Sequence, residues 1–223
     1  RRVRCLVRST SNLRWLEPLE SVELVEGELR KPRSLEAAAE GVETVYHLAG
    51  VTSAGSRAEY MEVNAGGTHN LVRALHKASA PPRRLVFLST LAAVGPSHRD
   101  VPLTEESPAR PITDYGHSKL KGEWFVREAA RTRGLPFTIL RVPIIFGPRD
   151  EGMLPFFKVI RRGVAPKLPG PEPQLSTLYV DDLVDGLVRA AREPDAAGRT
   201  YFLTHPDRFT FSELVRHIAR GVD

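Results

Sequence analysis

The stretch Leu85-Val86-Phe87-Leu88-Ser89-Thr90 is followed, twenty-five residues after Thr90, by Tyr115-Gly116-His117-Ser118-Lys119. The earlier stretch begins with four apolar residues, which is typical of a strand covered on both faces. In the later stretch, Tyr115 and Lys119 are four residues apart, so on a helix they lie on one face, one turn from each other. The two stretches therefore predict a buried strand followed by a helix that carries both side chains.

The chemistry of Tyr115 and Lys119 suits proton transfer at an oxygen atom. A free phenol has a pKa near 10, and an ammonium group beside it favours the phenolate. A hydroxyl group from another element could hold a substrate carbonyl or alcohol oxygen against the tyrosine. Such a proton transfer normally accompanies hydride transfer at the carbon that bears the oxygen. Taken alone, the pair also fits a surface tyrosine and a solvated lysine on an amphipathic helix.

Short β-branched runs alternate along the chain with longer helical patterns, which predicts a parallel α/β sheet with right-handed crossovers. The expected strands are Val3–Val7, Val22–Val25, Val42–Leu48, Leu85–Leu88, Phe137–Val142 and Thr200–Leu203. The expected helices are Ser34–Glu40, Ala58–Ala78, Thr113–Arg133, Met153–Arg162, Asp181–Arg192 and Phe211–Arg220. Gly134 and Pro136 predict the end of the helix that carries Tyr115.

A change of composition divides the chain near Pro148. Beyond this residue proline and glycine become frequent, and loops interrupt the β-α alternation. We therefore expect a sheet domain over residues 1–148 and a smaller, incomplete substrate lobe over residues 149–223, from which some elements return to the main sheet.

Composition limits the classes of function. The formal net charge is +5, but 26 of the 32 basic residues are arginines scattered along the chain, with no basic block interleaved with aromatic residues. A nucleic-acid partner is therefore not expected. No apolar run has the length of a membrane span. The single Cys5 allows no internal disulfide and fits a reducing compartment, so we expect a cytoplasmic protein.

Nine fragments, in order and with suitable spacing, resemble the extended short-chain dehydrogenase/reductases of the NAD-dependent epimerase/dehydratase type. They are Leu6-Val7-Arg8, Gly27-Glu28-Leu29, His47-Leu48-Ala49-Gly50, Val63-Asn64 with Gly67-Thr68, Ser89-Thr90 with Val94-Gly95, Tyr115 with Lys119, Leu140-Arg141, Gly147-Pro148 and Tyr179-Val180-Asp181-Asp182. The resemblance implies a doubly wound parallel sheet of the Rossmann type that binds a dinucleotide at the carboxyl ends of its strands. It also implies an enzyme, an NAD(P)-dependent oxidoreductase.

The resemblance assigns roles to individual residues. It implies that Tyr115 is the acid/base, that Thr90 holds the substrate oxygen, and that Lys119 tunes the tyrosine and holds the nicotinamide ribose. Ser89 is expected to be a structural hydroxyl at the end of its strand. The residues implied to contact the cofactor are Arg8, Glu28, Leu29, Leu48, Ala49, Gly50, Val51, Asn64, Tyr115, Lys119, Pro143 and Ile145. For Glu28, a solvated loop glutamate is the alternative.

Other polar positions have competing interpretations. His47 is expected to be structural, with a catalytic base as the alternative. Asn64 is expected to bridge backbone segments or touch the cofactor rather than take part in the chemistry. Asp181 and Asp182 could be read as a metal pair, but at the start of a helix they are expected to be cap and first-turn residues, so no metal is predicted.

The chain lacks the Gly-x-x-Gly-x-x-Gly turn that binds the pyrophosphate in the family. In the family, the strand that carries this turn lies between the strands matching Val3–Val7 and Val42–Leu48, and its loss would leave unpaired backbone groups at the sheet centre. We therefore expect a partial chain that lacks about thirty leading residues on family proportions and stops short at its C-terminus. As written, such a chain would bind cofactor poorly. A naturally short chain would instead favour a non-catalytic dinucleotide-binding protein.

The sequence after the first expected strand bears on the choice of cofactor. NAD-preferring relatives place an acidic residue there, whereas this chain has Arg8-Ser9-Thr10-Ser11. A guanidinium and hydroxyl groups suit a 2′-phosphate, which predicts NADP, with NAD as the alternative.

Two apolar positions bear on the substrate. Nucleotide-sugar epimerases and dehydratases usually carry Asn and Arg where this chain has Ile144 and Leu175. The replacements resemble the dihydroflavonol reductase and 3β-hydroxysteroid dehydrogenase branch, which implies a small-molecule ketone or secondary alcohol with an apolar body. A nucleotide-sugar epimerase or dehydratase is the alternative. The resemblance also makes a homodimer through the tyrosine-bearing helix plausible, with Trp124 and Phe125 at that contact or in the core.

Overall fold

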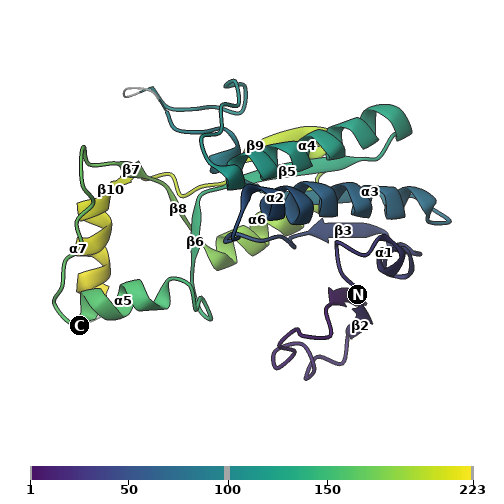
Figure 1. The fold of residues 1–223 in the computed structure, drawn as a ribbon, viewed down its shortest axis with the longest axis horizontal. Coiled ribbons are helices and arrows are strands. Elements are labelled where there is room, and N and C mark those ends of the chain that lie inside the picture. The colour runs from purple at the N-terminus through teal and green to yellow at the C-terminus, as the bar shows by residue number, and fades with distance from the viewer. Residues whose placement is uncertain (1, 98–100, 222–223) are drawn as a thin grey trace. The chain divides into compact units, whose positions relative to one another are not determined.

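The structure is a computed structural model that describes residues 2–97 and 101–221. The chain divides into two compact units (Figure 1). The larger unit is formed by Arg1–Arg141 together with Ala190–Tyr201, and the smaller unit by Val142–Arg189 together with Phe202–Asp223.

The larger unit is built on a four-stranded sheet with the strand order β3-β4-β5-β9. These strands are Thr44–His47, Arg84–Thr90, Phe137–Val142 and Arg199–Phe202. β3 and β4 pair in parallel, with His47 opposite Phe87. β5 is buried along its whole length and β4 along most of it, as their apolar sequences predict. β9, which follows most of the smaller unit in sequence, returns to the edge of this sheet. The predicted parallel α/β architecture is confirmed.

A second sheet of the larger unit consists of two parallel strands, β1 (Val3–Val7) and β2 (Val22–Glu26). Within residues 2–97 and 101–221, β1 is bonded to β2 alone, and β3 to β4 alone. The strand expected over Val42–Leu48 is correct in type, but it is shorter at both ends than the sequence suggests.

The hydrophobic core of the larger unit joins β4 and β5 to the helices α1 (Pro32–Ala39), α3 (Gly67–Lys77) and α4 (Asp114–Arg133). Fully buried members of this cluster are Leu35, Leu75, Leu85, Phe87, Val126 and Ile139. Burial of each such side chain contributes about 1.5–3 kcal/mol relative to its exposure. This apolar packing holds α4 against the strands that end at the candidate site.

The ends of α4 follow from its sequence. Thr113 caps the helix, since its side-chain oxygen accepts a hydrogen bond from the Gly116 backbone N–H at 3.0 Å. Gly134 closes the helix in a left-handed conformation with φ of 67°. The helix predicted over Thr113–Arg133 is therefore confirmed at both ends.

The continuous helix expected over Ala58–Ala78 is wrong in its interior. The segment contains a short α2 (Arg57–Tyr60), a π-helical stretch η1 (Met61–Gly66), and then α3. A π-helical turn inserts an extra residue into the helix and rotates the side chains on it, which apolar periodicity alone does not reveal. The insertion gives Asn64 the buried position described below.

The smaller unit contains two short sheets. β6 (Ile144–Phe146) pairs in parallel with β8 (Thr177–Tyr179), and β7 (Gln174–Leu175) pairs antiparallel with β10 (Phe209–Thr210). Its helices include α5 (Leu154–Arg161), most of α6 (Val180–Arg192) and α7 (Phe211–Gly221). The sequence predicts these helices but not the four strands, because two or three residues are too few to show a period.

Asp181 and Asp182 lie in the first turn of α6, where a negative charge favours the helix N-terminus. Among residues 2–97 and 101–221, no group of three or more His, Cys, Asp or Glu side chains is placed to hold a metal ion. No helix in the same residues is long and apolar enough to cross a membrane.

We predict that Gly116→Ala destabilises the protein by about 1–3 kcal/mol, because α4 cannot approach the end of β4 with a larger residue there. A Cβ at Gly116 would lie 2.2 Å from the Ala92 carbonyl oxygen, a backbone atom that cannot move aside alone. Gly66→Ala is the matched control, since its Cβ would make an ordinary contact of 3.6 Å. Urea denaturation measures both. Equal free energies of unfolding in the two variants would show that the close approach is not a constraint.

Candidate active site

Thr90 and Tyr115 come together where β4 ends and α4 begins. Thr90 is the last residue of β4, and Tyr115 lies in the first turn of α4. The Thr90 side chain lies close enough to the Tyr115 hydroxyl group to lower the pKa of the phenol. The Thr90 oxygen also accepts a hydrogen bond from the Ala92 backbone N–H at 3.2 Å, so its own proton remains available for donation.

Lys119 lies one turn further along α4 and is almost completely buried. Its Nζ lies 4.4 Å from the centre of the Phe87 ring, and a Cβ on Gly50 would lie 4.0 Å from it. Burial lowers the pKa of Lys119 to about 8, while the negative charge of Glu123 raises it. The side chain is therefore still an ammonium at neutral pH, but it loses its proton far more readily than a surface lysine.

The pKa of Tyr115 moves opposite to the expectation from its spacing to Lys119. Burial raises this pKa, the nearby Thr90 hydroxyl group lowers it only in part, and the neighbouring Tyr60 raises it further. Lys119 is not among the groups that shift the pKa of Tyr115 in the chain by itself. A phenol made acidic by this lysine together with the bound nicotinamide ring stays a prediction. The phenol holds its proton at neutral pH, which suits a proton donor.

Asn64 connects the loop after β3 to α4. Its side-chain oxygen accepts a hydrogen bond from the Val51 N–H at 2.8 Å, and its amide donates to the Val51 carbonyl and to Ser118 Oγ, both at 3.0 Å. Ser118 in turn donates to the Tyr115 carbonyl at 2.7 Å. Through these bonds Asn64 holds the loop that contains Gly50 against the helix that contains Lys119.

The model of the NAD dependent epimerase/dehydratase family matches residues 1–203. The chain belongs to this family. It is 33% identical over 219 residues to the uncharacterized protein y4nL of Sinorhizobium fredii, covering 96% of this chain and 61% of that protein. It is 29% identical over 218 residues to the ceramide reductase of Caulobacter vibrioides, covering 98% of this chain and 62% of that protein. The chain thus spans about three fifths of the length of these two relatives.

The fold of this family member is also that of solved structures. DesIV, a dTDP-glucose 4,6-dehydratase of Streptomyces venezuelae with NAD bound, is 26% identical with a TM-score of 0.84, over 100% of this chain and 72% of that chain. The predicted Rossmann-type fold is therefore confirmed.

The segments that follow β1 and β3 contain five of the twelve implied cofactor residues. After β3, Leu48, Ala49 and Gly50 are exposed and Val51 is half-buried. After β1, the exposed Arg8 begins a tight turn in which its backbone N–H donates to Ser11 Oγ at 3.0 Å. Both segments leave backbone and side-chain groups accessible to a dinucleotide.

Glu28 and Leu29 differ from each other in their surroundings. The Glu28 carboxylate accepts a hydrogen bond from Arg30 at 2.7 Å, which lowers the pKa of Glu28. Leu29 is buried in the core. A Cβ added to Gly67 would lie only 2.8 Å from the Leu29 Cβ. Its side chain is therefore part of the packing rather than of an open surface. Pro143 lies between β5 and β6, and Ile145 lies on β6, both in the smaller unit.

Sequence reasoning missed two residues next to Tyr115 and Lys119. Tyr60 on α2 lies with its ring centre 6.0 Å from that of Tyr115, and its hydroxyl donates to the Thr52 carbonyl at 3.1 Å. Glu123 lies one turn beyond Lys119 and is completely buried. The spacing of four residues from Lys119 could have indicated Glu123, because it places both on one face of the helix. Nothing in the sequence indicates Tyr60.

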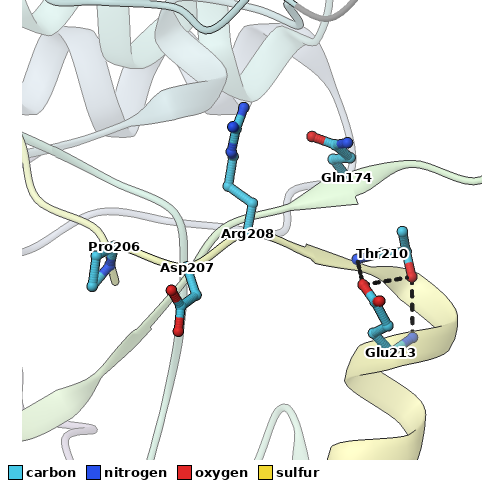
Figure 2. A pocket seen from close by; sticks show the side chains of 6 residues that line it. All are labelled: Gln174, Pro206, Asp207, Arg208, Thr210 and Glu213. Atoms are coloured by element: carbon cyan, nitrogen blue, oxygen red, sulfur yellow. Dashed lines mark hydrogen bonds between the residues drawn. The ribbon is translucent and has the colours of Figure 1, made fainter.

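The smaller unit has a separate open hollow of about 350 Å³ (Figure 2). It is lined by Gln174, Pro206, Asp207, Arg208, Thr210 and Glu213. Thr210 and Glu213 form a capping box at the start of α7, in which Glu213 accepts from the Thr210 N–H at 2.9 Å and donates its own N–H to Thr210 Oγ1 at 3.2 Å. Figure 2 shows Asp207 and Arg208 pointing in opposite directions. Thr210 and Glu213 thus serve helix capping, and the Asp207 and Arg208 side chains do not converge on one ligand atom.

His47 is a buried, neutral residue of the core. Thr68 Oγ1 donates its single proton to the Asn64 carbonyl at 2.6 Å, so it accepts from His47 Nε2 at 2.9 Å. Burial, followed by the charge of Lys119, lowers the pKa of His47 to about 3. The geometry matches the structural role expected from the sequence and leaves no proton to exchange near neutral pH.

We predict that His47 makes the protein acid-sensitive. The unfolded histidine takes up a proton below pH 6.5 while the folded one does not, so stability is lost as pH falls from about 6.5 toward 3. Between pH 7 and 5 this loss amounts to about 2 kcal/mol. Urea denaturation of wild type and His47→Gln at both pH values measures it. The same fall with pH in both proteins would contradict the assignment.

Proposed function

We propose that the protein is an NADP-dependent oxidoreductase that reduces a ketone, or oxidises a secondary alcohol, with an apolar body. The observation that carries this proposal is the placement of the Thr90 hydroxyl group beside the Tyr115 phenol, one helical turn from the buried Lys119. Two hydroxyl groups within reach of each other can hold one substrate oxygen. A nearby ammonium can hold the hydroxyl groups of a bound ribose.

The surroundings of Lys119 fit the nicotinamide end of a dinucleotide. An ammonium has three N–H donors. In the described part of the chain, Lys119 Nζ contacts the Phe87 ring face. Acceptors from a ligand would satisfy these donors, and the exposed Gly50 beside them leaves room for it. The chain contains no Gly-x-x-Gly-x-x-Gly turn, so this fit concerns the nicotinamide end alone.

The proposed mechanism gives each residue one task. When bound, NADPH supplies the hydride that reaches the carbonyl carbon. Thr90 donates a hydrogen bond to the substrate oxygen and keeps it beside Tyr115. Tyr115 gives its proton to that oxygen as negative charge develops there. The charge of Lys119 stabilises the phenolate that remains.

Two observations support an apolar carbonyl substrate. The first is the similarity to the ceramide reductase of Caulobacter vibrioides, by its name a reductase of a lipid, which covers 98% of this chain. Ile144 on β6 is 42% exposed, and neither it nor Leu175 on β7 can bind a diphosphate or a sugar. These apolar side chains favour the dihydroflavonol reductase and 3β-hydroxysteroid dehydrogenase branch of the family.

The first test of this proposal is catalytic. The intact protein is mixed with NADPH and a panel of apolar ketones, and oxidation of the cofactor is followed by its absorbance. We predict that Tyr115→Phe lowers kcat by about 100- to 10,000-fold, because the proton donor is lost, while NADPH binding is unchanged. Tyr201→Phe is the control, since Tyr201 is 39% exposed on β9. Full activity of Tyr115→Phe would exclude the tyrosine from the chemistry.

The second test concerns the cofactor. We predict that Arg8→Ala raises KM for NADPH roughly tenfold or more and leaves KM for NADH unchanged, because the guanidinium would meet only the 2′-phosphate. Steady-state kinetics with both cofactors measures this, and NADH serves as the internal control. An equal rise for both cofactors would contradict a contact with the 2′-phosphate.

A nucleotide-sugar epimerase or dehydratase is the second candidate, favoured by the fold and 26% identity shared with DesIV. The two candidates differ in what they bind. A calorimetric titration of the intact protein with UDP and dTDP distinguishes them, because the first candidate predicts no tight binding of either. Micromolar binding of UDP or dTDP would favour the second candidate.

A further inference from the structure

The Glu123 carboxylate has a hydrogen-bond donor at each of its acceptor positions. Ser89 Oγ donates to Oε1 at 2.6 Å, and Arg141 donates from Nε to Oε1 at 2.9 Å and from Nη2 to Oε2 at 2.7 Å. Arg127 Nη1 completes the set with a bond to Oε2 at 2.9 Å. A carboxylate has about four lone-pair sites, so all of them are used. Burial alone would raise the pKa of Glu123, but these donors lower it overall, and the group is ionised.

The donors come from several elements that meet at the candidate site. Ser89 is the residue of β4 directly before Thr90, and Arg141 lies near the end of β5. Arg127 lies on α4 itself and also donates to Thr200 Oγ1 of β9 at 3.0 Å. One carboxylate therefore links the helix that carries Tyr115 and Lys119 to the strand that carries Thr90.

The same carboxylate acts on the charge of Lys119. The groups that face Lys119 or interact with its charge from neighbouring elements are the neutral His47 of β3 and the Phe87 ring of β4, and Tyr115 lies one turn before it on its own helix. Glu123 is the carboxylate whose charge raises the pKa of Lys119 against the effect of burial. Arg127 and Arg141 partly neutralise the negative charge of Glu123. The net effect of the cluster on the pKa of Lys119 therefore depends on the glutamate and on both arginines.

We propose that Glu123 is a positioning residue of the active site: its carboxylate fixes the end of β4 against α4 and supplies the negative charge that keeps Lys119 an ammonium. This inference rests on the proposed function of Tyr115 and Lys119 and deepens it. Lys119 must carry its proton both to hold ribose hydroxyl groups and to stabilise a phenolate. The charge of Glu123 therefore sets the alkaline limit of activity.

A purely structural ion cluster makes a different prediction from this one. If Glu123 and Arg127 only hold α4 in place, removing either weakens the same packing and leaves the titration of Lys119 unchanged. If the cluster acts on Lys119, removing the negative charge lowers the pKa of the lysine, and removing a positive charge raises it. The sign of the shift separates the two roles.

The experiment compares Glu123→Gln, Arg127→Gln and the control Glu128→Gln in the intact protein. Glu128 is a matched control because it lies on the same helix and pairs with Arg131 at 2.7 Å on the surface. Lysine side-chain ¹⁵N NMR follows the titration of Lys119, which is assigned with Lys119→Arg among the six lysines of the chain. The alkaline limb of the kcat/KM profile with NADPH provides the second readout.

We expect the Lys119 titration and the alkaline limb to move down by about one pH unit in Glu123→Gln. In Arg127→Gln, whose side chain is 39% exposed, both move up by roughly a few tenths of a unit. Glu128→Gln leaves them unchanged. If Glu123→Gln does not fold, the upward shift in Arg127→Gln decides the question. Unmoved titrations in an active protein, or shifts of one sign in both variants, would overturn the inference.

The Lys119 titration is read without turnover, so the two proposals fail separately. Opposed shifts of Lys119 in a protein that reduces no carbonyl compound would refute the proposed function and support the action of Glu123 on the lysine. Reduction of a ketone with an unshifted Lys119 would refute the role of Glu123 alone.

Discussion

Between α4 and the strands β4 and β5, a completely buried carboxylate accepts hydrogen bonds from a serine and two arginines. A buried charge costs several kcal/mol to desolvate, and the cluster tolerates this only because each acceptor position of Glu123 is satisfied. Apolar packing of α4 would hold the helix on the sheet but would not fix its rotation. Directional bonds to Ser89 and Arg141 do fix it, and the relative placement of Thr90 and Tyr115 depends on that rotation.

Burial has opposite consequences for Lys119 and Tyr115, the two titratable groups of the candidate site. It lowers the pKa of Lys119 and raises that of Tyr115, since each neutral form is favoured away from water. The chain by itself therefore presents a protonated phenol beside a lysine that is close to losing its charge. A protonated phenol is the form required to reduce a carbonyl group. Oxidation of an alcohol requires the phenolate, which needs more positive charge nearby than Lys119 provides alone.

Most helices and strands of the larger unit were predicted from its sequence. A continuous apolar run gave the buried β4, and capping residues at Thr113 and Gly134 gave both ends of α4. The π-helical turn around Asn64 was not readable, because one inserted residue leaves the surrounding helical pattern intact. The two-residue strands of the smaller unit were missed for a related reason, since their pairing depends on distant segments rather than on local pattern.

The spacing of residues along the sequence predicted only part of the candidate site. The four-residue separation of Tyr115 and Lys119 correctly predicted their shared helix, but not the direction of the tyrosine pKa, because burial cannot be read from spacing. Leu29 was expected near the cofactor; its side chain is buried in the core, and a contact with the cofactor stays a prediction. Glu123 was overlooked because a glutamate on a helix is usually solvated. Its burial follows only from Ser89 and Arg141, which are distant in sequence.

The division of the chain also separates two kinds of chemistry. The groups proposed to move the proton all lie in the larger unit, on elements that a packed core holds together. Ile144 and Leu175, which bear on the choice of substrate, lie in the smaller unit, on strands of only three and two residues. Short strands impose few constraints on sequence, so residues there can change without disturbing the core. On the proposed function, the residues that bear on the substrate can therefore differ from those of relatives without disturbing the groups proposed to move the proton.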